Sequence, residues 1–445
     1  MMYNKRNRLD QTVLYKNNGG IFMKIEKLFT PEFNEKIIRL GEELFKNPEL
    51  GYKEVVTRSI LMDFFKENNI VGFTEHSVTG FIKTIGPSDA KYNIAIICDL
   101  DGVPTLGHKY SNKIDNAAHS CGHHEQMSVI SGVFHLVNEY KLLEGTDCKL
   151  TIIGTPAEEY VDLDYRNEQI KKHKIKKSSG KQNMILDGVF DDIDVVFNVH
   201  TNGSGKNLLD INTTLNGFIS KEVRFLGKSA HAGASPHLGI NALNAANLGM
   251  TAVHMLRETF EDQNHIRFHP IITNGGTTVN TVPEEVILKA YVRGATTEAI
   301  MDANKRINNA LTFSGKALGV EVEISDEFGY MPTRLSKELS QVVLNSMLEF
   351  VNEEDILHNQ ETTASGDVGD LSNIIPTVQF GYGGNEGLVH SKSFFTSDFE
   401  AAYILPMKVM LSSILKLANG EIEHVIKKFK QGMTKEEYIK NWLQE

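Results

Sequence analysis

The chain has 445 residues, more than one hydrophobic core usually supports, so two domains are the default expectation. Hydrophobic residues make up 41% of it, enough to form both cores. A formal net charge of -11 argues against nucleic acid or an anionic membrane as the main partner, because binding to phosphate needs clustered Lys and Arg, and favours a small-molecule substrate.

The three cysteines, Cys98, Cys121 and Cys148, are too few and too odd in number for a disulfide framework, which suggests a reducing compartment. The sequence shows neither an apolar run approaching about 18 residues nor the apolar segment of a signal peptide. We therefore expect a cytoplasmic protein with no membrane or nucleic-acid partner.

Residues 1–22 are polar and lack periodicity, and a second methionine, Met23, follows them. Gly19-Gly20 can be encoded by a ribosome-binding sequence a short distance before the Met23 codon. One hypothesis is therefore that translation starts at Met23 and that residues 1–22 are not native. The alternative is a disordered tail, and neither reading assigns chemistry to the segment.

Apolar residues recur at helical spacing from Pro31 to Ile70, and Pro48 and Gly51 interrupt the pattern, so two helices are predicted. Short apolar runs further on are typical of strands buried on both faces of a sheet. The predicted strands of this kind are Tyr92–Leu100, Lys149–Gly154, Asp194–Val199 and Pro376–Phe380.

Polar side chains suited to metal binding or proton transfer follow three of these strands. The first strand ends in Asp99 and Asp101, the second leads into Glu158 and Glu159, and the third delivers His200. The carboxyl ends of parallel strands meet at one edge of a sheet, where α/β folds place their sites. Each pair alone could be an ordinary turn or surface feature, but the repetition over three strands favours a site.

The segment Ala117–Met127 (AAHSCGHHEQM) places Cys121 and His123 two residues apart, with only Gly122 between them. Zinc and similar ions prefer thiolate and imidazole, and a glycine lets both side chains converge. The pattern is half of a metal site. The alternative is a buried cysteine beside a histidine in a turn.

After Thr213 the pattern changes to strand, helix, strands, helix and strand, as in a small α+β sandwich with helices on one face. The basic stretch Lys171–Lys181 before it is predicted to be a solvated insertion. The expected divisions are an extension over 1–22, a first domain over 23–212 and 327–418, an inserted domain over 213–326 and a tail over 419–445.

With these residues placed, the chain resembles the metal-dependent amidohydrolase family of carboxypeptidase G, aminoacylase and the indole-acetyl-amino-acid hydrolases, and most of all its p-aminobenzoyl-glutamate hydrolase branch. The motifs that carry the resemblance stand in the expected order: NPELGYKE, DLDGVP, HSCGHH, TPAEEY, NVH, GKSAHAG, NGGTTVNTVP, SGDVGDLS and LVHS. The resemblance implies an α/β, zinc-peptidase-like three-layer catalytic domain with an inserted α+β sandwich that acts as a lid and dimerisation domain.

The resemblance also implies two divalent metal ions, zinc or manganese, with cobalt or nickel as further options. Their ligands would be Cys121, His123, Glu159, His200 and His390. Glu158 would be the general acid/base, and His231 would stabilise the oxyanion, often in the active site of a partner subunit. Asn280 and Arg293 would contact substrate, and Asp101 would support the ligands.

Two departures from these relatives stand out. Many of them have His-x-Asp where this chain has Asp99-Leu100-Asp101. The indole-acetyl-amino-acid hydrolases usually show Asp and a nearby His after Cys-Gly-His, where this chain has His124, Glu125 and Gln126.

The expected function is hydrolysis of the amide bond of an N-acyl amino acid or dipeptide-like small molecule by a homodimer, with a metal-activated water and Glu158 as base. One alternative is an exopeptidase acting on free N-termini; Arg293 and Asn280, which could hold a carboxylate, speak mildly against it. Another is a non-catalytic binding protein on the same fold, which the presence of every expected ligand and of the base disfavours.

Overall fold

The computed structural model describes residues 14–16, 22–203 and 207–444. The chain divides into two compact units. The first unit comprises Met1–Thr213, Arg334–Gln360 and Leu371–Ile439, and the second comprises Thr214–Thr333, Glu361–Asp370 and Lys440–Glu445. The inserted domain expected over 213–326 is therefore shorter than the second unit, which gains two later segments of the chain.

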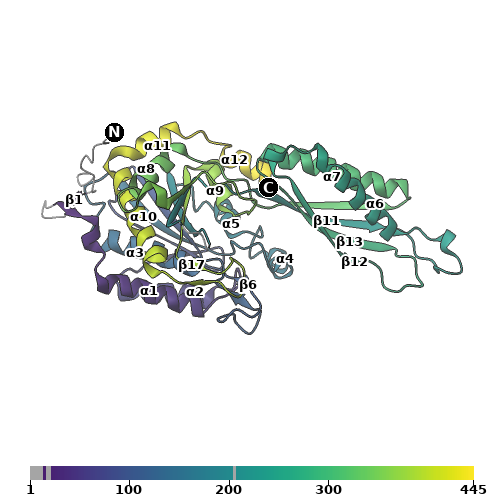
Figure 1. The fold of residues 1–445 in the computed structure, drawn as a ribbon, viewed down its shortest axis with the longest axis horizontal. Coiled ribbons are helices and arrows are strands. Elements are labelled where there is room, and N and C mark those ends of the chain that lie inside the picture. The colour runs from purple at the N-terminus through teal and green to yellow at the C-terminus, as the bar shows by residue number, and fades with distance from the viewer. Residues whose placement is uncertain (1–13, 17–21, 204–206, 445) are drawn as a thin grey trace, which may run out of the picture. The chain divides into compact units, whose positions relative to one another are not determined.

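An eight-stranded sheet is the centre of the first unit (Figure 1). Its order is β15-β10-β16-β9-β5-β8-β4-β3, and the central pairs β16–β9, β9–β5 and β5–β8 are parallel. The strands are β3 Thr74–His76, β4 Gly80–Ile85, β5 Tyr92–Asp99, β8 Cys148–Thr155, β9 Val195–Thr201, β10 Leu209–Ile211, β15 Ile356–His358 and β16 Thr377–Tyr382. The α/β class is thus confirmed, and the carboxyl ends of β5, β8 and β9 lie beside one another.

Helices cover this sheet. Helix α3 packs against β5, β8 and β9, helix α8 packs against β10 and β16, and α10 packs against both helices. Thr30 caps α1, whose first residue is Pro31, and accepts a hydrogen bond from the Phe33 amide. The α-helices other than α6 and α7, which belong to the second unit, are α1 Pro31–Lys46, α2 Val55–Glu67, α3 His123–Glu139, α4 Leu163–Lys171, α5 Gly180–Leu186, α8 Lys337–Met347, α9 Val368–Ile374, α10 Leu405–Lys416, α11 Ile422–Lys428 and α12 Lys435–Tyr438.

The helical stretch Glu400–Lys428, which contains α10 and α11, is long and apolar enough to span a membrane by length and composition alone. This corrects the expectation that no apolar segment approaches that length. However, 83% of its most apolar window is buried inside the protein, so we interpret it as a core helix.

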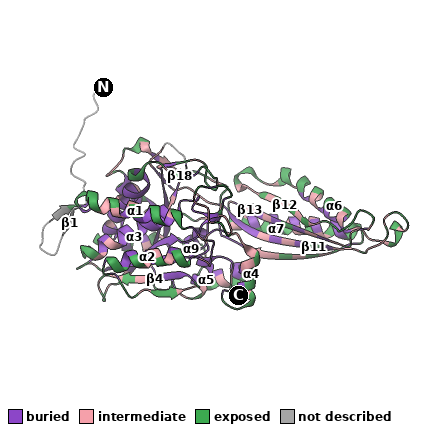
Figure 2. Cartoon of the chain, turned by 90° about the horizontal axis from the view of Figure 1, so that it is seen from below, coloured by how far each residue is buried: buried purple, intermediate pink, exposed green. Residues whose placement is uncertain are grey.

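The second unit is an antiparallel sheet of order β12-β13-β11-β14 with two helices packed on it. Its elements are β11 Gly217–Leu226, α6 Ala242–Met255, β12 Arg267–Asn274, β13 Glu285–Gly294, α7 Thr297–Ala317 and β14 Glu321–Phe328. In the two inner strands, β11 and β13, buried residues alternate mainly with half-buried ones, whereas the outer strands β12 and β14 have only half-buried and exposed residues (Figure 2). Val223, Phe225 and Leu288 belong to the core that this sheet shares with the helices.

Three short two-stranded pairs complete the fold: β1 Leu14–Lys16 with β2 Phe22–Lys24, β6 Val103–Pro104 with β7 Ala117–Ala118, and β17 Asn385–Glu386 with β18 Phe395–Thr396. Part of the extension over 1–22, for which a disordered tail was one of two readings, is therefore a paired strand. The rest of it, residues 1–13 and 17–21, lies outside the described residues.

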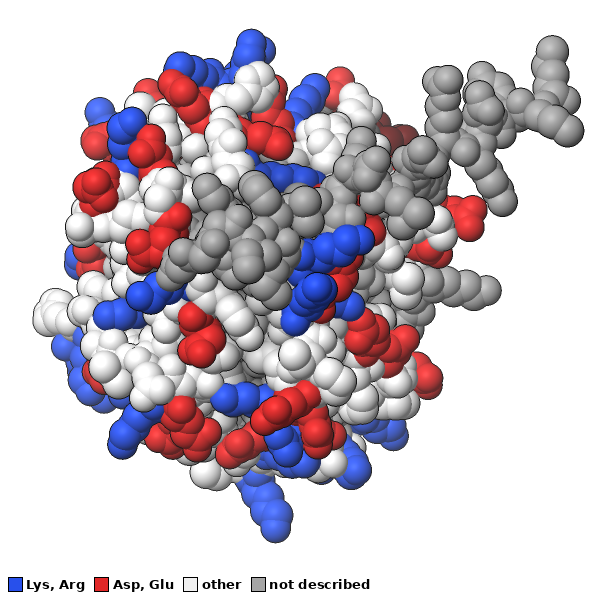
Figure 3. Space-filling model, turned by 90° about the vertical axis from the view of Figure 1, so that its left-hand side faces the viewer, with Lys and Arg blue, Asp and Glu red and all other residues white. Residues whose placement is uncertain are grey.

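The prediction of a solvated basic stretch over Lys171–Lys181 is wrong at its end. Lys181 is fully buried and forms an ion pair with Asp99, because α5 turns this end of the stretch into the core. Elsewhere, basic and acidic side chains are interspersed over the described part of the face drawn in Figure 3.

Candidate metal centre

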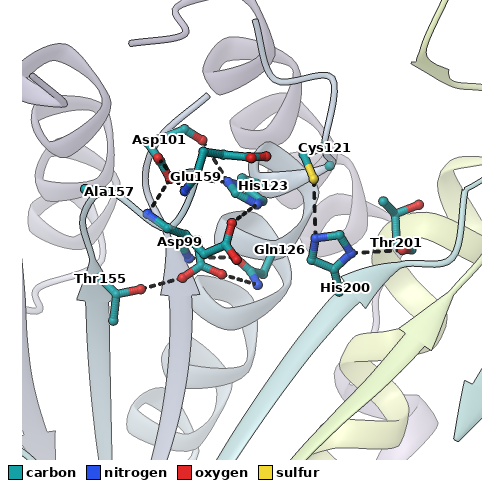
Figure 4. Close-up of polar contacts among 12 residues, drawn as sticks. Asp99, Asp101, Cys121, His123, Gln126, Thr155, Ala157, Glu159, His200 and Thr201 are labelled. Atoms are coloured by element: carbon teal, nitrogen blue, oxygen red, sulfur yellow. Dashed lines mark hydrogen bonds and ion pairs between the residues drawn. The ribbon is translucent and has the colours of Figure 1, made fainter. Parts of the chain in front are cut away.

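The five expected metal ligands and Glu158 come together in the first unit. Their donor atoms form three overlapping groups, each with all atoms within 4.8 Å of one another. The groups are Cys121 with His123 and His200, Cys121 with Glu159 and His390, and His123 with Glu158 and Glu159. Figure 4 shows Cys121, His123, Glu159 and His200 gathered at the ends of the central strands.

Cys121 belongs to two of the three groups. Its Sγ lies 3.5 Å from Nε2 of His200 and 3.2 Å from Nε2 of His390. The same His390 nitrogen lies 3.0 Å from Oε1 of Glu159. A thiolate between two imidazoles, with a carboxylate next to them, is a donor set that suits zinc and comparable divalent ions.

Gly122 makes the approach of Cys121 and His123 possible. Its φ is +79°, in the left-handed region, and it precedes the first residue of α3. A Cβ on Gly122 would lie 2.8 Å from Cγ2 of Thr201, the neighbour of His200. Any other residue here would be strained and would push the start of α3 away from β9.

Asp101 positions three neighbouring residues but supplies no atom to the three groups. Its Oδ1 accepts the backbone N–H of Glu158 at 3.1 Å, and its Oδ2 accepts that of Glu159 at 3.0 Å. Its backbone oxygen lies 2.8 Å from Nδ1 of His123. When that Nδ1 donates to it, Nε2 of His123 is left unprotonated and turned toward the site.

The turn before the glutamate pair is held by a buried carboxylate. Ala157 has a φ of +54°, unusual for a residue with a side chain, and its N–H donates to Oε1 of Glu54 at 2.9 Å. Glu54 also accepts a hydrogen bond from the Thr79 hydroxyl. Burial, together with the charge of Asp101, raises the pKa of Glu54 to about 7.

Gln126 joins the strand ends beneath the site. Its Nε2 donates to Oδ2 of Asp99 at 3.0 Å, to Oδ1 of Asn198 at 2.7 Å and to the Val199 carbonyl at 2.8 Å. The other oxygen of Asp99 accepts from the Thr155 hydroxyl at 2.5 Å and pairs with Lys181. The sequence offered no signal for Lys181, because its partner lies far away in the chain.

The charges of the site support one another. Burial and the charge of Glu159 oppose ionisation of Cys121, but His200 and His123 outweigh them and lower the pKa of the thiol to about 6. Burial opposes ionisation of Glu159 as well, but its hydrogen bond to His390 and the charge of that residue lower its pKa to about 2.

One buried atom of the site, Nε2 of His123, is left without a hydrogen bond to any described residue. Buried polar atoms are normally satisfied, so a buried ring nitrogen that faces a thiolate and two carboxylates without a hydrogen bond is what a metal ligand leaves. The residues present therefore fit divalent metal ions.

The other two cysteines contribute no donor atom to this centre. Cys98 is fully buried, and its thiol donates to the Ile153 carbonyl over 3.9 Å. Cys148 is buried at the start of β8, and all three cysteines are free thiols.

His231 and Asn280 lie side by side in the second unit. His231 forms a β-bridge with Thr281, and the Ala232 N–H donates to the Asn280 carbonyl at 2.8 Å. His231 is exposed, and its Nδ1 accepts the N–H groups of Gly233 at 3.2 Å and Ala234 at 3.0 Å. The neutral ring therefore carries its proton on the exposed Nε2.

Arg293 lies at the other end of the same sheet. The pairing of β11 with β13 puts Leu226 opposite Glu285 and Phe218 opposite Arg293, whereas His231 follows beyond Leu226. Eight positions along β13 separate Glu285 from Arg293, which is about 27 Å of strand. Within one chain, the structure thus separates Arg293 from His231 and Asn280.

The Arg293 guanidinium stacks over Phe218 and Tyr291, with ring centroids at 5.6 and 5.5 Å, and donates to the Ser365 hydroxyl at 3.0 Å. These contacts fix the direction of a planar, charged donor group. Ser365 is the first residue of the motif SGDVGDLS.

One family model matches most of the chain. Residues 95–416 match the family model of Peptidase family M20/M25/M40. The Xaa-Arg dipeptidase of Mus musculus is 26% identical over 383 residues, covering 82% of this chain and 80% of that protein.

Two solved structures share the fold. A dinuclear metal-binding peptidase of the M20 family from Bacillus subtilis superposes with a TM-score of 0.66 at 18% identity, covering 88% of this chain and 99% of that one. The aminobenzoyl-glutamate utilization protein of Klebsiella pneumoniae has a TM-score of 0.61 at 15% identity, covering 88% and 97%.

Proposed function

Because this chain belongs to peptidase family M20/M25/M40, whose members hydrolyse amide bonds, we propose that it cleaves the amide bond of N-acyl amino acids or dipeptide-like small molecules. The observation that carries the proposal is the convergence of five metal-type donors beside Glu158. The relatives support the substrate class: one is a dipeptidase, and the other's name contains aminobenzoyl-glutamate, which is itself an N-acyl amino acid.

We assign the two metal sites to Cys121, His123, Glu159, His200 and His390. The dinuclear metal-binding peptidase from Bacillus subtilis supports the number of ions. The thiolate favours zinc, while the imidazoles and carboxylate also suit manganese, cobalt or nickel. Bound there, the ions would lower the pKa of a water molecule and polarise the substrate carbonyl.

Glu158 is the proposed general base. It takes a proton from the attacking water and returns it to the leaving amine. Its Oε2 lies 3.8 Å from Nε2 of His123, so the carboxylate borders the ligand groups, and its backbone is held by Asp101. The neighbouring Glu159 is committed to His390 and Cys121, which leaves proton transfer to Glu158.

In the second unit, His231 is the proposed oxyanion stabiliser. Its tautomer presents the Nε2–H as a donor, because backbone N–H groups occupy Nδ1. Asn280, beside it, would contact the polar part of the substrate. Arg293 would bind a substrate carboxylate, for which a stacked guanidinium is suited.

The separation of Arg293 from His231 supports a homodimer. One small substrate cannot span about 27 Å of strand, so if both residues contact it, they come from different chains. The edge strand β12 and helix α6 expose Ile271, Leu248 and Met255, which a second copy could cover. We further propose a cytoplasmic location, with which three free thiols are consistent.

A substrate panel tests the function. The protein reconstituted with zinc or manganese would be offered N-acetyl, N-benzoyl and N-aminobenzoyl amino acids together with dipeptides, and amine release would be measured. We expect turnover of N-blocked substrates. Turnover of free dipeptides alone would favour the exopeptidase alternative, and no release by fully metal-loaded protein would leave a binding protein.

A further inference from the structure

A cavity lies in the first unit, apart from the five proposed metal ligands. It has a volume of about 470 Å³ and is bounded by the end of α1, the segment 108–110, the start of α3 and the segment 392–403. None of the five proposed metal ligands lines it. Its volume is within the usual range for pockets that bind small molecules.

Helix α3 separates the cavity from the metal centre. Successive residues of a helix point about 100° apart, so His123 faces the ligands while His124 lines the cavity. The His124 ring stacks on Phe45, with centroids 4.3 Å apart and planes 25° apart. Its Nε2 donates to the Thr396 hydroxyl at 3.3 Å, and Thr396 donates to the buried Glu125.

The walls are largely aromatic and partly open. The rings of Phe45, Tyr110, Phe395, Phe399 and Tyr403 line the cavity. Phe395 and Phe399 keep 45% and 38% of their surface exposed. Exposed aromatic faces around a hollow favour another ring, which can stack on them or meet them edge to face.

The charges around the cavity favour an anion. Lys46, Lys109 and Lys392 line it, and Glu42 is the one acidic residue among its lining residues. None of the three lysines forms an ion pair with a residue that the structure describes.

His108 is held by the protein and is not available to a ligand. Its Nδ1 accepts the Tyr110 N–H at 3.2 Å, and its Nε2 donates to the Phe394 carbonyl at 3.0 Å.

We propose that this cavity binds a small aromatic carboxylate, with its ring between the aromatic walls and its carboxylate toward the three lysines. The site does not depend on the metal ions or on the proposed reaction, since no ligand or base lines it. It would be a second ligand site, next to the loop that carries His390.

Calorimetric titration of the metal-loaded protein with phenylacetate tests the proposal. We expect binding at one site. Phenylacetamide, which keeps the shape but loses the charge, should bind about 10-fold more weakly, and cyclohexylacetate, which keeps the charge but loses the aromatic ring, about 5-fold more weakly. Equal binding of all three compounds would overturn the proposal.

Variants locate the site. Because exposed charges are individually worth little, Lys46→Glu and Lys109→Glu should each weaken binding about 3-fold, and together about 10-fold. Lys66→Glu, at an exposed lysine on α2 that does not line the cavity, is the matched control and should bind as the wild type does. An unchanged affinity in the double variant would contradict the assignment.

Binding to protein that a chelator has stripped of metal distinguishes this site from the metal centre. Phenylacetate binding should survive removal of the metal ions, and its loss would show that the ligand sits on the metal centre and not in the cavity. Failure of the proposed hydrolysis would appear as absent amine release and would leave this binding unchanged.

Discussion

Glu158 and Glu159 are adjacent in sequence, yet their surroundings give them different tasks. Glu159 Oε1 lies 3.0 Å from Nε2 of His390, and Glu159 belongs to two donor groups, while Glu158 belongs to one. Glu158→Gln should therefore keep the metal and lower turnover by at least about 10²-fold. Glu159→Gln should lose metal. Elemental analysis of the metal content of each variant tests both expectations. Equal loss of metal in the two variants would show that the roles of Glu158 and Glu159 are misassigned.

Glu54 predicts a pH dependence of stability. Burial raises its pKa to about 7 in the folded protein from 4.5, so the folded state holds this proton more tightly than the unfolded state does. The stability that it contributes is full below about pH 4.5 and is lost as the pH rises through about 7. Glu54→Gln should flatten the fall in unfolding free energy between pH 5 and pH 8, measured by urea denaturation.

Glu67→Gln, at an exposed position on α2, is the control for this measurement and should leave the pH profile unchanged. An identical slope in wild type and Glu54→Gln would show that Glu54 ionises freely in the folded state.

Which site residues could be predicted depends on where their partners lie. Asp101, Glu159 and His200 were visible in the sequence because each follows a recognisable buried strand, and parallel strands bring such ends together. Glu54 and Lys181 were not, because their roles arise from contacts with Ala157 and Asp99, far away in the chain. No periodicity marks such contacts.

At the scale of elements, a buried ion pair links α5 to the end of β5. Lys181 and Asp99 are almost fully buried, and the helix starts at Gly180, where a Cβ would lie 1.7 Å from the Pro156 carbonyl oxygen. Lys181→Met would leave the Asp99 charge buried without its partner, so it should lower the unfolding free energy by about 3–5 kcal/mol.

The double variant Lys181→Met with Asp99→Asn is the matched control for that prediction. It removes both charges and should recover part of the stability, as measured by urea denaturation. If the single and the double variants are equally unstable, lost packing rather than the unpaired charge explains the effect.

A helix or strand could be predicted from the sequence where one of its faces is buried, or where it is buried on all sides, because both cases leave a regular pattern of apolar residues. The helices α1 and α2 and the strands β5, β8 and β9 fall where periodicity indicated them. The edge strand β12 was not identified beforehand, because it sits among short polar turns and half of its residues are exposed. The end of the basic stretch is buried and not solvated, because Lys181 pairs with Asp99, which is far away in the chain.

At the scale of the whole molecule, the proposed homodimer predicts complementation. His231→Ala and Glu158→Gln should each be nearly inactive, with at least about 10²-fold lower turnover. In a mixed dimer, the chain with an intact Glu158 would receive His231 from its partner and regain one complete site. Turnover should therefore rise when the two variants are mixed under conditions of subunit exchange.

The control for this experiment is a mixture in which both variants carry Glu158→Gln, which should stay inactive. No recovery in mixtures that demonstrably form mixed dimers would place His231 in its own chain's site, against the separation from Arg293 along β13. Wild-type turnover by His231→Ala alone would remove this residue from the mechanism.

The central claim is that Cys121, His123, Glu159, His200 and His390 hold two metal ions that the reaction requires. The most direct test is to strip the protein with a chelator and to measure amine release while zinc or manganese is added back in known amounts per chain. We predict no turnover without metal and a rise that saturates at two equivalents. Full turnover by metal-free protein, or saturation at one equivalent, would contradict the account.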